Sequence, residues 1–77
     1  MIVLGVDPGL AITGFGVVRV ENNRQVVLGY GAIRTPAGDS TARRLETIYR
    51  ELSKLIAEFS PSCLAVEELF FNKNVTT

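Results

Sequence analysis

Two acidic residues each end a short apolar segment of this 77-residue chain. Asp7 follows the run IVLGV near the amino end, and Glu67 follows CLAV near the carboxyl end. An ionised carboxylate at the end of a buried strand needs a partner, a changed pKa or a bound cation. Carboxylate oxygens are ligands that Mg²⁺ accepts. Asp7 and Glu67 are therefore the candidate catalytic and metal-binding residues.

Asp7 also has a simpler interpretation as a turn residue. In Asp-Pro-Gly, Pro8 presets its own φ angle and Gly9 can supply a positive one. Two further glycines follow at Gly14 and Gly16, where a missing Cβ lets a ligand or another backbone come close. This repeated glycine favours a functional site over a turn alone.

Three apolar segments rich in β-branched residues predict three successive strands. They comprise residues 2–7, 13–20 and 25–34, and the polar cluster 21–24 separates the last two. Short connections make consecutive strands antiparallel, so a three-stranded meander is expected. In the third strand apolar residues occupy both alternating sets of positions, which predicts at least partial cover on both of its faces.

An amphipathic helix is expected after the segment TPAG. Asp39, Ser40 or Thr41 can cap its start, and Pro61 ends it. One apolar stripe runs along it in steps of three and four, with Tyr49 and Ile56 beside it. The stripe comprises Leu45, Ile48, Leu52, Leu55 and Phe59. Two heptads are too few for a coiled coil, so the stripe is predicted to pack against the sheet.

A fourth strand is expected over residues 62–67. A helical crossover allows it to lie parallel to the first strand, which brings their carboxyl ends to one edge of the sheet. Asp7 and Glu67 would then stand about 5 Å apart, one strand spacing. Two like charges at that separation repel unless a divalent cation lies between them.

Composition limits the chemistry available. The net charge is zero and the chain has no histidine, so carboxylates, Lys, Tyr or the single Cys63 must supply any metal ligand or acid–base group. A basic excess is usual in nucleic-acid-binding domains, and its absence counts modestly against DNA or RNA. The objection weakens if basic residues cluster in space, for which the candidates are Arg34, Arg43, Arg44 and Lys73.

The composition also indicates the cellular compartment of the protein. Cys63 lies in an apolar run and is expected to be buried, without a disulfide partner. No charged leader precedes the first strand, and no apolar run approaches the roughly 20 residues of a membrane span. A reducing, cytoplasmic setting is therefore expected.

Four stretches together carry a resemblance to a known family. In chain order they are LGVDPGLAITGFGVV, IRTP at the end of the third strand, RRL at the helix start, and AVEELFFNKN. They resemble the amino-terminal half of the RuvC family of Holliday junction resolvases. The resemblance implies an α/β, RNase H-like fold with a five-stranded mixed sheet and helices on both sides. Residues 1–77 would be the amino-terminal part of one such nuclease domain, truncated after the fourth strand.

The same resemblance implies an activity. The family is dimeric and Mg²⁺-dependent, cuts two opposed strands of a four-way DNA junction in recombination and repair, and acts with branch-migration proteins. Asp7 and Glu67 match the first two of its four carboxylates. The other two, both aspartates, have no counterpart here, so this piece alone is expected to be inactive.

The resemblance also implies which residues contact DNA. Phe70 matches an aromatic position at the junction centre, where an exposed ring can stack on a base, and Phe71 and Lys73 lie beside it as further DNA-binding candidates. The alternative is that both rings pack against an element absent from this chain. Glu68 points away from the Glu67 side by strand alternation, and the family match selects Glu67.

Two other functions are compatible with parts of the pattern. A sugar-kinase or actin-like nucleotide-binding domain opens with a similar Asp-x-Gly-x-x-x-x-Gly hairpin, which Asp7, Gly9 and Gly14 satisfy. In that interpretation the hairpin cradles phosphates, but the segment VEELFF has no use there. A metal-free junction-binding module is the third possibility, and Mg²⁺ dependence separates it from a nuclease.

Overall fold

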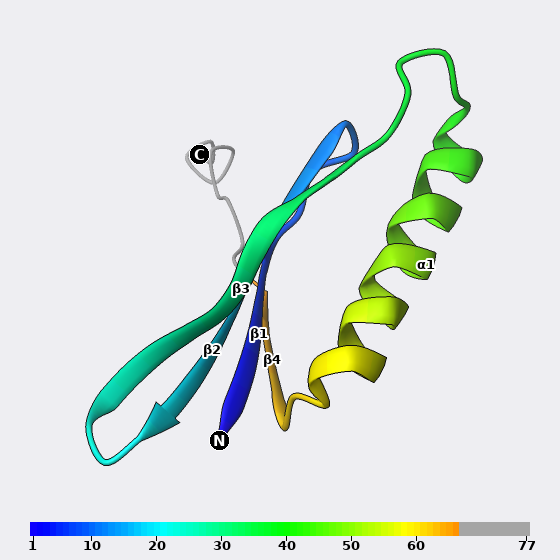
Figure 1. Cartoon of the computed structure of the whole chain (residues 1–77). Helices are drawn as coiled ribbons and strands as arrows, with labels where there is room; N and C mark the ends of the chain where they lie inside the picture. Colours follow the sequence, from blue (N-terminus) through cyan, green and yellow to red (C-terminus); the bar gives the residue numbers. More distant parts are fainter. Residues whose placement is uncertain (67–77) are drawn as a thin grey trace, which may run out of the picture.

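The computed structural model describes residues 1–66 and consists of a sheet with one long helix (Figure 1). In chain order the elements are β1 (Ile2–Asp7), β2 (Ile12–Glu21), β3 (Arg24–Arg34), α1 (Thr41–Phe59) and β4 (Cys63–Val66). The predicted order of three strands, one helix and a fourth strand is confirmed.

The strands form one mixed sheet in the order β3-β2-β1-β4. β1 pairs antiparallel with β2, β2 pairs antiparallel with β3, and β4 adds to the other side of β1 in parallel. The α1 crossover permits this parallel pairing, because a short hairpin connection would reverse the chain direction. The meander and the parallel fourth strand are both as predicted.

The β2–β3 hairpin turns through two asparagines. Asn22 and Asn23 have φ angles of 47° and 64°, the positive values that a two-residue type I′ connection requires. The register shifts between Val17 and Val18, where a β-bulge interrupts the pairing with β3. A bulge bends a strand and increases its twist, and the curvature of the hairpin is visible in Figure 1.

Both ends of α1 are capped. Among the three candidate caps, Ser40 takes the position, and its hydroxyl accepts a hydrogen bond of 3.2 Å from the Arg43 amide. At the other end Ser60 adopts a left-handed conformation and its amide donates to the Ile56 carbonyl at 2.9 Å. Pro61 follows directly, so the helix ends where the sequence predicts.

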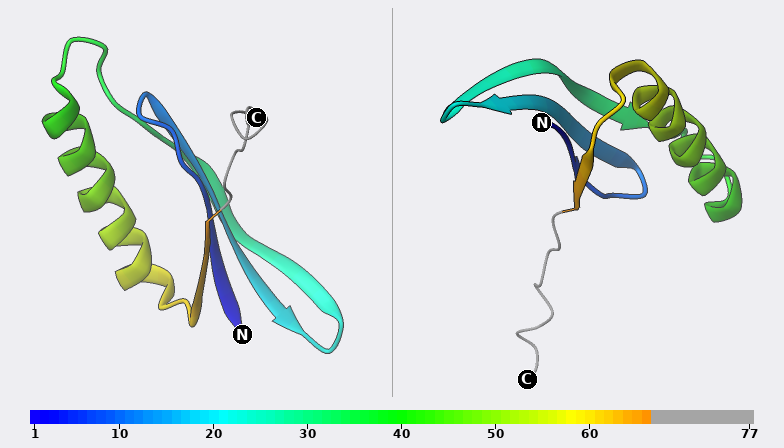
Figure 2. Two further views of the ribbon diagram at one scale, coloured as in Figure 1. Left: turned by 180° about the vertical axis from the view of Figure 1, so that it is seen from behind. Right: turned by 90° about the horizontal axis from the view of Figure 1, so that it is seen from below.

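The core lies between α1 and one face of the sheet. Figure 2 shows the helix on a single side of the strands, and within residues 1–66 no second element covers the opposite side. Leu4 and Val17 are 1% and 0% exposed. The half-buried apolar side chains packed against this core are Ile2, Phe15, Leu28, Leu52, Leu55 and Phe59.

The helix packs more closely at its carboxyl end than at its amino end. Leu52, Leu55 and Phe59 reach the core as predicted, whereas Leu45 and Tyr49 are largely exposed. Between the amino half of α1 and the sheet lies an open cavity of about 320 Å³. Cover by the helix is therefore complete only over part of the predicted stripe.

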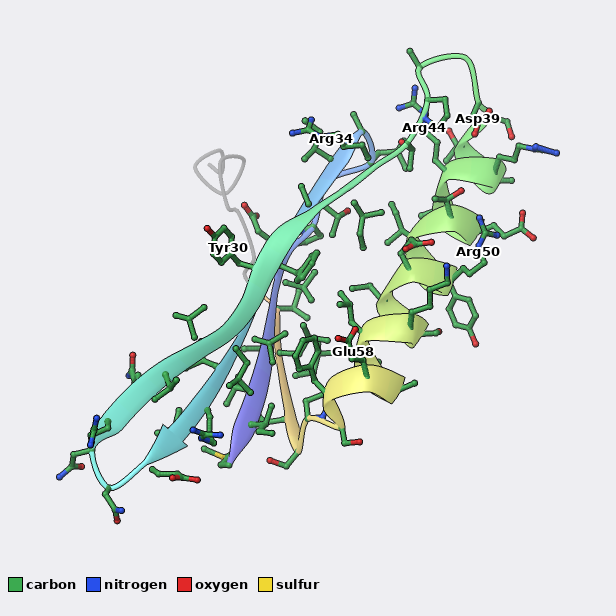
Figure 3. The ribbon with its side chains drawn as sticks, in the orientation of Figure 1. Tyr30, Arg34, Asp39, Arg44, Arg50 and Glu58 are labelled. Carbon is green, nitrogen blue, oxygen red and sulfur yellow. The ribbon has the colours of Figure 1, made fainter. Side chains whose placement is uncertain are left out.

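Two expectations about burial are wrong. Cys63 is exposed, because it pairs with Val3 and so lies on the open face of the sheet, away from α1. The third strand is not covered on both faces: in β3 only Ile33 is buried, and Tyr30 is 82% exposed. β3 is the opposite edge of the sheet, and Figure 3 shows Tyr30 on the side away from the helix.

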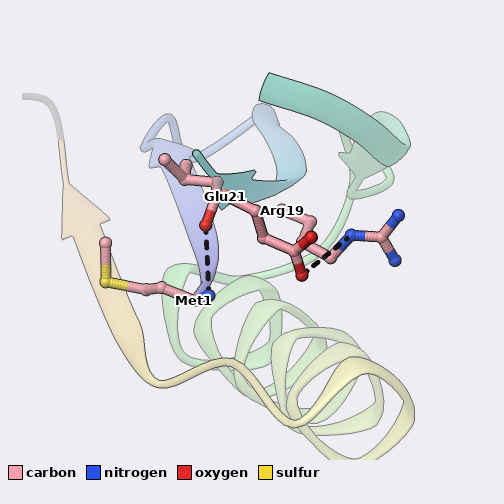
Figure 4. Close-up of polar contacts among 4 residues, drawn as sticks. Met1, Arg19 and Glu21 are labelled. Carbon is pink, nitrogen blue, oxygen red and sulfur yellow. Dashed lines mark hydrogen bonds and ion pairs between the residues drawn. The ribbon is translucent and has the colours of Figure 1, made fainter. Parts of the chain in front are cut away.

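The amino terminus is fixed at the end of the sheet far from Asp7. The Met1 carbonyl accepts from the Val20 amide at 2.8 Å, and the terminal ammonium donates to the Val20 carbonyl at 3.2 Å. Arg19 and Glu21 form an exposed ion pair beside it (Figure 4). Among the described residues, no helix is long and apolar enough to cross a membrane.

Candidate active site

Asp7 is the last residue of β1 and points away from the core. Side chains alternate along a strand, and the buried Val6 faces α1, so Asp7 faces the open side. The residue is exposed, and within residues 1–66 no hydrogen bond or ion pair engages its carboxylate. The carboxylate is therefore available to a ligand.

Glycines surround Asp7 on this open face. Asp7 pairs across β1–β2 with Gly14, and Gly5 pairs with Gly16 two residues earlier on the same face. These backbones form the floor of a shallow depression of about 590 Å³. Ala65 and Val3 line the same depression.

The glycine floor leaves bare backbone exposed to a ligand. A Cβ added at Gly16 would meet no atom within 4 Å, and one at Gly5 would meet only the Gly16 carbonyl oxygen at 3.8 Å. Neither residue has a positive φ, so backbone conformation does not explain the choice of glycine. The absence of side chains here makes a flat surface that can admit a bulky group beside Asp7.

The connection that follows Asp7 is held on the helix side of the sheet. Pro8, Gly9 and Leu10 line the cavity beside α1. The buried threonines Thr13 and Thr35 both bond to this connection through their hydroxyls. No sequence motif marks either threonine as functional. For Thr13 the available signal was a threonine among apolar strand positions, whereas Thr35 directly follows β3.

β4 brings the second acidic segment beside the first. Its described pairing with β1 ends at Val66, which lies opposite Val6. Val6 directly precedes Asp7, and Val66 directly precedes Glu67. Glu67 lies outside the described residues, so its pairing with Asp7 stays a prediction. The DNA-binding candidates Phe70, Phe71 and Lys73 lie outside them as well.

The described residues contribute one acidic ligand to a metal site. Residues 1–66 contain no group of three or more His, Cys, Asp or Glu side chains placed to hold an ion. The exposed Asp7 carboxylate suits a hard cation that takes oxygen ligands. Asp7 therefore fits Mg²⁺ as one ligand, and further ligands have to come from outside this part of the chain.

The candidate basic residues separate into two groups. Arg34 pairs with Ile12, two positions beyond the row of Ala32, Gly14 and Asp7, and so shares the open face with Asp7. Arg44 instead lies at the start of α1, where its guanidinium donates to the Ala37 carbonyl at 2.8 Å. Figure 3 shows both at the same end of the molecule, but only Arg34 belongs to the Asp7 face.

Comparisons with known proteins identify relatives of this chain. The family model for the crossover junction endodeoxyribonuclease RuvC matches residues 3–77. The RuvC proteins of Alkaliphilus oremlandii and Heliobacterium modesticaldum are 58% and 56% identical over the whole chain, which covers 47% and 48% of their lengths. The chain thus spans about half the length of the curated relatives it matches.

Solved structures show the same fold. T. thermophilus RuvC in complex with a Holliday junction substrate superimposes with a TM-score of 0.84 at 32% identity, over 92% of this chain and 46% of that one. The Aquifex aeolicus PPX-GPPA enzyme aligns at a TM-score of 0.66 but only 18% identity, which shows a shared fold alone. The RNase H-like α/β architecture implied by the sequence is confirmed. Sequence and fold agree, and the chain belongs to the RuvC family of crossover junction endodeoxyribonucleases.

Proposed function

We propose that residues 1–77 form the amino-terminal part of one RNase H-like nuclease domain, in an Mg²⁺-dependent endonuclease that resolves four-way DNA junctions in recombination and repair. The observation that carries the proposal is the exposed Asp7 carboxylate at the end of a central strand, beside a glycine floor; within residues 1–66 no hydrogen bond or ion pair engages this carboxylate. Family membership and the junction named for the T. thermophilus complex support the choice of DNA substrate.

Asp7 acts in this proposal as a fixed cation ligand. β1 pairs with β2 as far as Asp7 and with β4 as far as Val6, so the strand that leads to Asp7 is held on both sides. When bound, Mg²⁺ would polarise the scissile phosphate and favour formation of hydroxide from water. Glu67 is the proposed second ligand, because the β1–β4 register leads to it directly after Val66.

The open face suits a sugar–phosphate backbone. Gly5, Gly14 and Gly16 present no side chain that would keep a strand of DNA away from Asp7. Arg34 stands on the same face and can pair with a phosphate. Phe70, Phe71 and Lys73 are the further proposed DNA contacts, with Phe70 stacking on a base at the junction centre.

Several properties belong to the proposal through the family alone. A homodimer, cooperation with branch-migration proteins and a cytoplasmic location are what the family resemblance implies. The 77-residue piece by itself is proposed to be inactive, because Asp7 and Glu67 leave most of an octahedral Mg²⁺ shell to water.

A nucleotide-binding alternative is disfavoured by the β1–β2 connection. A phosphate cradle needs free backbone N–H groups directed at the ligand. Here the Gly9 N–H donates to the Thr13 hydroxyl at 3.3 Å, on the helix side of the sheet. That donor is therefore occupied, although the Asp-x-Gly-x-x-x-x-Gly pattern is present.

The proposal is tested in a chimera in which these 77 residues replace the matching 77 residues of the A. oremlandii relative. In Mg²⁺ the chimera should cut a synthetic four-way junction. Asp7→Asn should lower the cleavage rate by roughly 10²- to 10³-fold or more while junction binding is kept, because the amide preserves shape and removes charge.

Glu21→Gln is the matched control, since it removes an exposed acid at the far end of the sheet. It should cut at the rate of the parent chimera. An Asp7→Asn chimera that cuts at the parent rate would disprove the assignment. Junction binding by the parent without any Mg²⁺-dependent cutting would favour the metal-free binding module instead.

A further inference from the structure

We propose that Thr13 and Thr35 are positioning residues that hold the connection 8–11 on the helix side of the sheet and thereby fix the presentation of Asp7. The inference rests on the proposed role of Asp7 as a cation ligand. Both residues are buried, and both bond to the connection on the side of the sheet that faces α1.

Thr13 binds both polar groups of one residue in the connection. Its hydroxyl donates to the Gly9 carbonyl at 2.6 Å and accepts from the Gly9 amide at 3.3 Å. The Thr13 side chain is only 1% exposed. Because a buried hydroxyl and a partly buried peptide group each need a partner, these two bonds satisfy both residues at once.

Thr35 holds the next two residues of the same connection. Its hydroxyl donates to the Leu10 carbonyl at 2.8 Å, and its amide donates to the Ala11 carbonyl at 3.1 Å. Thr35 directly follows β3, so this contact joins the β1–β2 connection to the strand at the edge of the sheet. Three successive carbonyls, those of Gly9, Leu10 and Ala11, are therefore held by two threonines.

Apolar packing does not replace these bonds. Pro8, Gly9 and Leu10 line the open cavity of about 320 Å³ together with side chains of α1, so the connection lacks close neighbours on that side. Gly9 also has to remain glycine, because a Cβ there would collide with the Ile12 carbonyl oxygen. The position of the connection thus depends on the two threonine hydroxyls, on the bond from the Thr35 amide to the Ala11 carbonyl, and on one bare glycine.

Holding the connection in place affects the orientation of Asp7. The chain leaves β1 at Asp7 and turns at once toward the helix, which keeps residues 8–10 off the open face. A connection released from Thr13 and Thr35 would be free to swing across that edge and to reorient the Asp7 backbone. Small displacements of a catalytic group are costly, because the reacting atoms must keep near-attack geometry.

The test uses the chimera described above and substitutes each threonine in two ways. Thr13→Val and Thr35→Val keep the shape and remove the hydroxyl, whereas Thr13→Ser and Thr35→Ser keep it. Thr47→Val in α1 is the control, because the Thr47 hydroxyl makes no side-chain hydrogen bond within the described part of the chain. Tm, junction binding and the Mg²⁺ dependence of cleavage are measured for each variant, at a temperature well below the lowest Tm.

We expect Thr13→Val to lower the maximal cleavage rate roughly 10- to 100-fold and to raise the Mg²⁺ concentration at half-maximal rate. Junction binding should not change, and Thr13→Ser should restore most of the rate. Thr35→Val should show the same pattern with a smaller effect, since one carbonyl loses its partner instead of a whole peptide group. A purely structural role would instead lower Tm and leave both the rate and the Mg²⁺ dependence at the values of the parent.

Failure of the proposed function is distinguishable from failure of this inference. If the parent chimera cuts and Asp7→Asn does not, valine variants with parent-like rates and Mg²⁺ dependence would overturn the positioning role. If the parent chimera does not cut, the proposed function fails, and amide hydrogen exchange decides the positioning role separately. Faster exchange of the Gly9 amide in Thr13→Val with global protection kept would support it, and unchanged exchange would overturn it.

Discussion

Glycine has opposite roles on the two faces of the sheet. On the helix side a Cβ at Gly31 would lie 3.0 Å from the Phe15 ring, and one at Gly29 would lie 3.3 Å from the Phe59 ring. On the open side a Cβ at Gly16 would meet nothing within 4 Å. Glycine therefore admits an aromatic ring into the core on one face and leaves bare backbone on the other.

This contrast separates residues that stabilise the fold from residues that form the site. The buried aliphatic side chains and the Phe15 and Phe59 rings lie with α1, whereas Asp7 and Arg34 lie on the glycine-lined side. An exposed carboxylate on a bare surface contributes little to stability, so its placement is better explained by function than by packing. Substitutions on the two faces should accordingly affect different measurements.

The largest difference in the free energy of unfolding is expected between alanine substitutions at two neighbouring valines. Val17 is fully buried against the core and Val18 is half-exposed on the open face. Val17→Ala should lower the free energy of unfolding by about 2 to 3 kcal/mol, from lost burial and a residual cavity. Val18→Ala should cost at most about 1 kcal/mol. Chemical denaturation of the 77-residue chain measures both.

The stability costs of Val17→Ala and Val18→Ala can also be compared in the chimera. If the remainder of the relative covers the open face, the cost of Val18→Ala should rise toward that of Val17→Ala. Equal costs already in the 77-residue chain would contradict the distinction between a covered and an open face.

A smaller and opposite pair of effects is expected for two glycines. Gly31→Ala places a methyl group against the Phe15 ring and should destabilise the chain by about 1 kcal/mol. Gly16→Ala meets open space at a position without positive φ, and should stabilise it by about 0.4 to 1 kcal/mol by restricting the unfolded chain. Thermal unfolding distinguishes the signs, and two variants with effects of the same sign would refute this account of the glycines.

The smallest effect is expected on the exposed surface of the helix. Lys54 and Glu51 form a solvent-exposed pair at 3.2 Å. Glu51→Gln should change the free energy of unfolding by about 0.5 kcal/mol or less, because exposed pairs are weak and screened by salt. A loss above about 1 kcal/mol at 0.15 M salt would show that the surface of α1 contributes more to stability than its distance from the core indicates.

Local patterns predicted most of the fold correctly. Asn22 and Asn23 sit at a turn that needs two positive φ values, Ser40 caps α1, and Pro61 follows its end. The parallel placement of β4 followed from chain connectivity, because a helix between two strands permits it. Each of these features depends on residues close in sequence or on chain direction, so no tertiary information was required.

Burial was predicted less well, because it depends on which face of the sheet α1 covers. Cys63 lies in an apolar run, yet its pairing with Val3 places it on the open face, and the thiol is exposed. β3 carries apolar residues on both faces, yet Tyr30 pairs with Gly16 on the open face and is exposed to solvent. An apolar pattern shows that a segment can be buried, and the position of the covering layer decides which face is buried.

The sequence by itself determined the order of the elements, the turns and caps, and Asp7 as the leading candidate for chemistry. Only the tertiary structure decided that Asp7 faces away from α1, that Gly5, Gly14 and Gly16 surround it, and that Thr13 and Thr35 hold the connection behind it. The physical reason is that turns, caps and periodicity depend on neighbouring residues, whereas the site and its support depend on contacts between strands. The hydroxyl of Thr35 reaches Leu10 across 25 positions of the chain, a distance over which no local pattern carries information.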